Sequence, residues 1–144
     1  MGSGLVCSDD VVWSFFQGGF DLGYLLKLLK PEKLPKDQKG FGELVKLYFP
    51  NFYDLKYLTD HIDRHRDTGL NQLARRLGLE RIGRKHQAGS DSLLTTQAFF
   101  EMRKQYPRLM EEAKNVVAGI GLGQAEFPDY GRQSEPQLQH LKKE

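Results

Sequence analysis

The segment ERIGRKHQAGSDSLLT, residues 80–95, carries the most specific pattern in this sequence. Basic residues come first, the small residues 88–90 follow, and Asp91 then precedes an apolar segment that runs to residue 105. A carboxylate in the first turn of a helix faces the positive end of the helix dipole and free N–H groups, which favour its ionised form. The small residues between His86 and Asp91 let a backbone or a phosphate group approach closely.

Outward from this segment, apolar residues recur with helical spacing. Leucines at 22, 25, 26 and 29 predict a helix that Pro31 ends. The β-branched and aromatic run VVWSFF at 11–16 predicts a short buried strand closed by a turn, and residues 52–53 predict a second brief strand. The apolar residues of 92–105 point almost all round the helix, which is typical of a buried helix. Further helices are expected over 41–48, 55–62, 70–77 and 109–117.

Composition indicates one globular domain. The chain has 144 residues, of which 39% are apolar and 28% charged, and its formal net charge of +2 commits it to neither nucleic acid nor membrane. No run approaches the roughly 18 apolar residues of a membrane span, so no membrane association is expected. The single cysteine, Cys7, excludes an internal disulfide and fits a reducing compartment. We expect a domain over residues 1–123 and a flexible polar tail over 124–144.

Two carboxylates and a histidine are the main candidates for chemistry. Asp21 follows the first expected strand and opens the first helix, and Asp91 lies five residues after His86. Ionised carboxylate oxygens are the ligands that Mg²⁺ or Mn²⁺ takes, and a histidine titrates near neutrality. Each residue also has a simpler interpretation, because an aspartate before an apolar helix is usually a cap and a lone histidine usually an exposed loop residue. Periodicity does not choose between them.

Other polar groups are weaker candidates. Residues 60–65 place Asp60, His61, Asp63 and His65 at a spacing that could hold a metal, but a solvated polar turn at a helix end is the favoured interpretation. Asp54 resembles a helix cap, with a smaller chance of lining a site. The run 64–86 holds seven Lys or Arg against two acidic residues and would suit RNA phosphates, or form an ordinary solvated face. Its members nearest the histidine are Arg81, Arg84 and Lys85.

The segment 80–95 resembles the third exonuclease motif of the Caf-one/Pop-two deadenylases, the poly(A)-shortening subunit of the Ccr–Not complex. Residues 19–27, GFDLGYLLK, resemble the second motif of that family, and LYFP at 47–50 and YDLKYL at 53–58 match as well. The resemblance covers roughly residues 3–123. It implies an α/β, ribonuclease H-like fold of the DEDD exonuclease type, here truncated and mostly helical with one or two remaining strands.

The same resemblance implies roles for the candidate residues. Asp21 would bind one of two divalent ions, Mg²⁺ or Mn²⁺, and Asp91 the other, while His86 would deprotonate the attacking water. The implied activity is 3′→5′ shortening of poly(A) tails by two-metal-ion phosphodiester hydrolysis. The implied partners are poly(A) RNA and the scaffold and second deadenylase of the Ccr–Not complex, in nucleus and cytoplasm.

The sequence also departs from the family pattern. The first motif of the family is Asp-x-Glu, whose aspartate bridges both metals, and these 144 residues contain no Asp-x-Glu. Their start corresponds to the middle of the family's domain, so we expect its C-terminal portion with impaired activity. Gln17, Phe20 and Arg84 stand where the family often has His, Tyr and Pro. The alternatives are a catalytically silent relative that binds RNA or Ccr–Not subunits, and a fragment without an independent fold.

Overall fold

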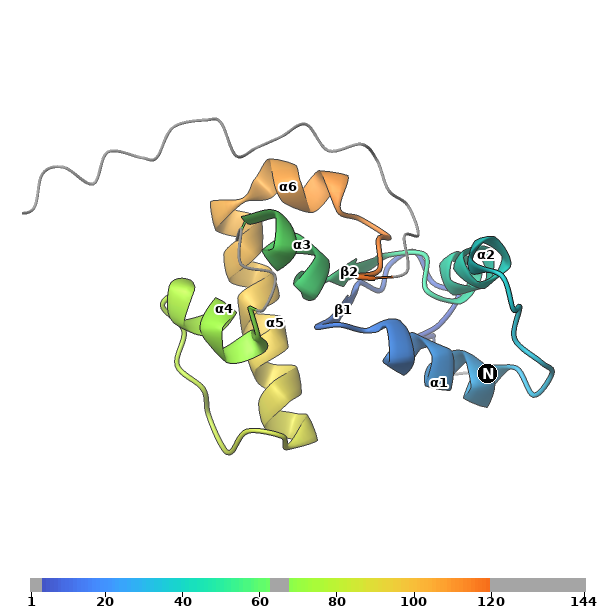
Figure 1. Cartoon of the computed structure of the whole chain (residues 1–144), viewed down its shortest axis with the longest axis horizontal. Coiled ribbons are helices and arrows are strands. Elements are labelled where there is room, and N and C mark those ends of the chain that lie inside the picture. Colours follow the sequence, from blue (N-terminus) through green and yellow to red (C-terminus); the bar gives the residue numbers. More distant parts are fainter. Residues whose placement is uncertain (1–3, 63–67, 120–144) are drawn as a thin grey trace, which may run out of the picture.

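The computed structural model describes residues 4–62 and 68–119 (Figure 1). Two short strands and six helices follow one another along these residues. The elements in chain order are β1 (Trp13–Phe15), α1 (Gly19–Leu29), α2 (Gln38–Tyr48), β2 (Phe52–Asp54), α3 (Leu55–Ile62), α4 (Leu70–Arg76), α5 (Ala88–Gln105) and α6 (Pro107–Glu112). The prediction of a mostly helical chain with one or two strands is therefore confirmed. No helix among these residues has the length and apolar character needed to span a membrane.

The two strands form a parallel sheet between two groups of helices (Figure 1). Trp13 is paired with Phe52, and the Trp13 N–H donates to the carbonyl of Asn51 at 2.9 Å. The other edge of β2 is occupied by Asn115, whose N–H donates to the Phe52 carbonyl at 2.9 Å and whose Oδ1 accepts the Phe52 N–H at 2.9 Å. Within residues 4–62 and 68–119, no strand pairs with the other edge of β1.

The core is divided into two apolar clusters. One is built on α1, α2 and β2, and its fully buried members include Leu22, Leu26 and Phe49. The other joins α3, α4, α5 and α6, with Met102 of α5 fully buried inside it. Complete burial of a side chain of this size is worth about 1.5–3 kcal/mol. The two clusters meet at the sheet, which fixes the ends of β1 and β2 relative to α5.

Two expectations about the helices are wrong in part. The segment 92–105 is not buried all round, since Leu93 and Phe100 are 42% and 56% exposed and α5 already begins at Ala88. The expected helix 109–117 is shorter, since α6 runs from Pro107 to Glu112 and the chain then turns through residues 113–115, with Asn115 in a left-handed backbone conformation (φ 64°). The polar tail expected at 124–144 lies outside the described residues, so the domain division stays a prediction.

Candidate active site

An open pocket of about 760 Å³ lies where β1, the starts of α1 and α4, the loop before α5 and the first half of α5 come together. Asp21, His86 and Asp91 all line it, although Asp21 is far from the other two in the sequence. Arg81 and Lys85 line it as well, whereas Arg84 is exposed on the same loop and is not part of the lining. The structure thus brings the three expected catalytic residues to one pocket.

Asp21 presents a carboxylate with no competing partner. It is exposed in the first turn of α1, and within the described part of the chain its side chain has no hydrogen bond or ion pair. The cap position of α1 belongs to Gly18, so Asp21 is not the helix cap that the simpler interpretation required. Its location in the first turn places the carboxylate at the N-terminal end of α1.

His86 lies in a strained backbone at the mouth of the pocket. Its φ of 60° is in the left-handed region, which costs a residue other than glycine about 1–3 kcal/mol. The side chain is exposed and lies two residues before Ala88, the first residue of α5. His86 is one of the residues that line the pocket.

Asp91 is held by an ion pair that sequence reasoning did not find. Arg81 Nη1 lies 2.6 Å from Asp91 Oδ1, and the two side chains are 13% and 37% exposed. The cap position of α5 belongs to Gln87, so Asp91 is not a cap either. The Arg81 guanidinium, expected to contact RNA, is bound within the chain. No sequence signal identifies this pairing, because the two residues are joined through a loop of irregular conformation.

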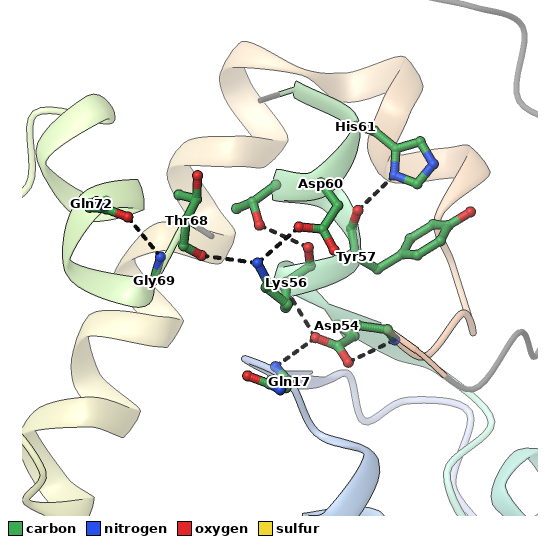
Figure 2. A network of polar contacts seen from close by, with 11 residues as sticks. Gln17, Asp54, Lys56, Tyr57, Asp60, His61, Thr68, Gly69 and Gln72 are labelled. Carbon is green, nitrogen blue, oxygen red and sulfur yellow. Dashed lines mark hydrogen bonds and ion pairs between the residues drawn. The ribbon is translucent and has the colours of Figure 1, made fainter. Parts of the chain in front are cut away.

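Asp54 is a third carboxylate, for which the sequence predicted a helix cap with a smaller chance of lining a site (Figure 2). It is 1% exposed and accepts four backbone N–H groups, which is more than capping of α3 requires. The donors are Gln17 at 2.8 Å, Gly18 at 3.1 Å, Lys56 at 3.1 Å and Ala118 at 3.0 Å. Burial raises the pKa of the Asp54 carboxyl above its ordinary value, and the four hydrogen bonds oppose the increase. Asp54 fixes the turn before α1 but is not part of the pocket lining.

The metal interpretation of residues 60–65 gains no support from the described positions. Asp60 forms an ion pair with Lys56 at 2.9 Å, and His61 Nδ1 lies 2.7 Å from the carbonyl oxygen of Tyr57 (Figure 2). Asp63 and His65 lie outside the described residues. The contacts of Asp60 and His61 fit a polar helix end.

The donors in the pocket fit part of a divalent-metal site. Carboxylate oxygens are what Mg²⁺ and Mn²⁺ take, and Asp21 and Asp91 supply one carboxylate each. Across residues 4–62 and 68–119, no group of three or more His, Cys, Asp or Glu side chains is arranged to hold a metal ion. Asp21 and Asp91 therefore fit as two ligands of divalent ions, and the remaining ligands would come from groups outside the described residues.

Comparison with known proteins defines the class. No family model matches the chain. A solved structure of Schizosaccharomyces pombe Pop2p in its Mg²⁺- and Mn²⁺-bound form superposes with a TM-score of 0.74 and 39% identity, over 82% of this chain and 47% of that chain. Yeast CAF1, co-crystallised with the NOT1 MIF4G domain, superposes with a TM-score of 0.72 and 31% identity, over 81% and 49% of the two chains. The fold is the ribonuclease H-like fold of these RNase domains.

Sequence relatives agree with the structural neighbours. The probable CCR4-associated factor 1 homolog 7 of Arabidopsis thaliana is 44% identical over 123 residues, which cover 85% of this chain and 44% of that protein. Poly(A) ribonuclease pop2 of Schizosaccharomyces pombe is 37% identical over 140 residues, which cover 96% of this chain and 42% of the relative. Over most of its length the chain is homologous to the CCR4-associated factor 1 and Pop2 ribonucleases. It spans less than half the length of these relatives.

Proposed function

We propose that this chain carries part of the active site of a 3′→5′ exoribonuclease that shortens poly(A) tails. The observation that carries the proposal is the convergence of Asp21, His86 and Asp91 on one pocket. The names of its relatives supply the reaction class, since one of them is a poly(A) ribonuclease and one was solved with Mg²⁺ and Mn²⁺ bound.

Each of the three side chains has a distinct task in this proposal. Asp21 and Asp91 each contribute one carboxylate ligand, and His86 accepts the proton of the attacking water at an imidazole nitrogen. Divalent ions held in part by Asp21 and Asp91 would supply charge stabilisation to the oxygens of the phosphodiester that change charge in the reaction. The His86 side chain lines the pocket, and among the described residues it forms no hydrogen bond or ion pair.

RNA contacts are assigned to the basic residues of the loop before α5. Lys85 lines the pocket and is exposed, and Arg84 is exposed beside it, so both are accessible to backbone phosphates. Among the described residues, neither side chain forms an ion pair or hydrogen bond. Arg81 contributes only indirectly, since its guanidinium is engaged by Asp91.

We further propose that the activity of these 144 residues by themselves is impaired. No Asp-x-Glu occurs in the sequence, so two of the four acidic ligands of the family pattern have no counterpart here. Catalysis of this type depends on the placement of its ions, and a partial ligand set places them poorly.

A second candidate is a binding protein of the same lineage without catalysis. It is favoured by the ion pair of Asp91 with Arg81, which neutralises one of the proposed ligands. The partner in that case is a scaffold subunit of the Ccr–Not complex, because a relative was co-crystallised with the NOT1 MIF4G domain, or poly(A) RNA. Both candidates place the protein in nucleus and cytoplasm, where poly(A) tails occur.

An RNA with a labelled 5′ end and an oligo(A) tail, incubated with the purified chain and Mg²⁺ or Mn²⁺, tests the first candidate. The expected result is a slow shortening ladder that a chelator, Asp21→Ala and Asp91→Ala each abolish. A ladder that survives these changes comes from a contaminating nuclease and contradicts the proposal. An intact tail, together with retained oligo(A) or NOT1 MIF4G binding, establishes the second candidate.

A further inference from the structure

The Arg81 side chain is fixed by contacts that do not involve Asp91. Its Nε donates to Asn71 Oδ1 at 2.7 Å, and its Nη1 donates to Ser90 Oγ at 2.8 Å. Asn71 belongs to α4 and Ser90 to α5, so the guanidinium bridges two helices across the rim of the pocket. The two helices therefore set the direction in which the second N–H of Nη1 points toward Asp91.

The hydroxyl that receives Arg81 is itself fixed. Ser90 Oγ donates to the Ile82 carbonyl at 2.7 Å, which closes the loop before α5 onto the helix. Gly83 passes so close that an added Cβ would lie 3.2 Å from Ser90 Cβ, and its φ of 91° suits only glycine. The contacts with Asn71 and Ser90 therefore fix the Arg81 side chain independently of Asp91.

This arrangement makes the two oxygens of Asp91 unequal. Oδ1 accepts the short hydrogen bond from Arg81, and in the described residues no hydrogen bond reaches Oδ2. A cation bound at Oδ1 would lie next to the guanidinium, and this repulsion is strong because Arg81 is largely buried. Only Oδ2 is left as a metal ligand.

We propose that Arg81 is a positioning residue that restricts Asp91 to coordination through one oxygen and so makes the pocket favour Mg²⁺ or Mn²⁺ over Ca²⁺. The inference rests on the proposed function, in which Asp91 is a metal ligand. Ca²⁺ takes 6–8 oxygens and often both oxygens of a carboxylate, whereas Mg²⁺ uses six positions at shorter distances. A carboxylate limited to one oxygen therefore penalises Ca²⁺ more.

The test measures the binding of Mn²⁺ to the full chain by electron paramagnetic resonance of the free ion, with Ca²⁺ as competitor. We expect the chain to prefer Mn²⁺ by about tenfold or more. In Arg81→Met and Arg81→Lys we expect the preference to narrow by about fivefold, because neither side chain has the fork that reaches Asn71 and Asp91 together. Arg108→Met on α6, which makes the same charge change outside the pocket, should leave the preference unaltered.

The outcomes separate this inference from the proposed function. A uniform change in affinity for both ions in the Arg81 variants would reflect charge alone and would overturn the inference. An unchanged preference in variants that keep the circular dichroism spectrum of the original chain would also overturn it. If Mn²⁺ binds but Asp91→Asn has no effect on its affinity, or if no Mn²⁺ binds, Asp91 is not a ligand, and the proposed function fails together with the inference.

Discussion

The amide of Asn115 pairs with the backbone of Phe52 as a neighbouring strand would. The side-chain Oδ1 accepts the Phe52 N–H, and the backbone N–H of Asn115 donates to the Phe52 carbonyl, both at 2.9 Å. The side-chain Nδ2 donates to the Pro50 carbonyl at 2.8 Å. One residue thus satisfies the edge of β2 that β1 leaves open. Its backbone has a positive φ of 64°, in the turn that follows the end of α6 at Glu112.

Asn115→Ala should destabilise the fold by about 2–4 kcal/mol, since it leaves the buried Phe52 N–H unpaired and puts alanine, which tolerates positive φ less well than asparagine, at a φ of 64°. Urea unfolding followed by circular dichroism measures the change. The exposed neighbour Lys114 supplies the control, and Lys114→Ala should stay within about 0.5 kcal/mol. Equal stability of the two variants would show that the Asn115 pairing contributes nothing.

Asp54→Asn should lower the free energy of unfolding by about 2–4 kcal/mol, because an amide has one acceptor oxygen where four backbone N–H groups converge on the carboxylate. The NH₂ group of the asparagine would also face N–H donors. The exposed Asp10→Asn is the matched control. Retention of full stability by Asp54→Asn would contradict the role of Asp54 as the junction between β1, α1 and residue 118.

The same carboxyl should make stability depend on pH in a defined direction. Burial raises the pKa of Asp54 in the folded chain above its ordinary value of 3.8. The stability that this shift contributes to the fold is therefore complete below pH 3.8 and is lost as the pH rises through the pKa of the folded chain. The difference in unfolding free energy between the original chain and Asp54→Asn should therefore widen on acidification from pH 7 toward pH 4. A difference that shrinks over this range would mean that the hydrogen bonds outweigh burial.

Asp21 and Asp91 should respond differently to loss of charge. Asp21→Asn should alter the unfolding free energy by less than about 0.5 kcal/mol, because the side chain is exposed and forms no hydrogen bond or ion pair with the described residues. Asp91→Asn should cost about 1–2 kcal/mol, a value reduced by its partial exposure, because Arg81 loses its counter-charge. Thermal unfolding without added metal measures both. Equal changes in unfolding free energy in the two variants would show that the ion pair with Arg81 does not stabilise the fold.

An apolar stripe on α1 should cause self-association. Phe20, Tyr24 and Leu28 lie one turn apart and are 80%, 73% and 82% exposed, which is unusual for large apolar side chains on one face. The edge of β1 that no strand pairs with in residues 4–62 and 68–119 lies just before the same helix. Sedimentation velocity should show association that grows with concentration and weakens in Tyr24→Lys/Leu28→Lys.

Leu47→Lys, at an exposed apolar position of α2, is the control for this stripe. If it weakens association equally, the α1 face has no special role. A chain that stays monomeric at high concentration would refute the prediction outright.

Local patterns in the sequence predicted the elements that depend on neighbours in the chain. The leucine spacing of α1, the β-branched and aromatic run of β1 and the segment before α5 all describe contacts within a few residues. Together with the resemblance to known motifs, they also selected Asp21, His86 and Asp91, which line one pocket.

What the sequence did not predict depends on side chains that reach distant backbone. The Asp54 carboxylate binds amides at 17, 18 and 118, and the Asn115 amide binds strand β2. Aspartate and asparagine are both common in caps and turns. Their local sequence is therefore the same whether the side chain binds only neighbouring backbone or also binds a distant segment. The Arg81–Asp91 pair was missed for a related reason, since a basic residue in a loop ordinarily indicates solvent or RNA.

The central claim is that Asp21 and Asp91 bind divalent cations in one pocket, with His86 beside them. Paramagnetic broadening of backbone amide signals by Mn²⁺, recorded by nuclear magnetic resonance on the ¹⁵N-labelled chain, tests it most directly. We predict that substoichiometric Mn²⁺ broadens the signals around residues 21, 86 and 91 together, and that Asp21→Asn and Asp91→Asn each weaken all three. Broadening at only one of these positions, or at the polar end of α3 instead, would contradict the claim.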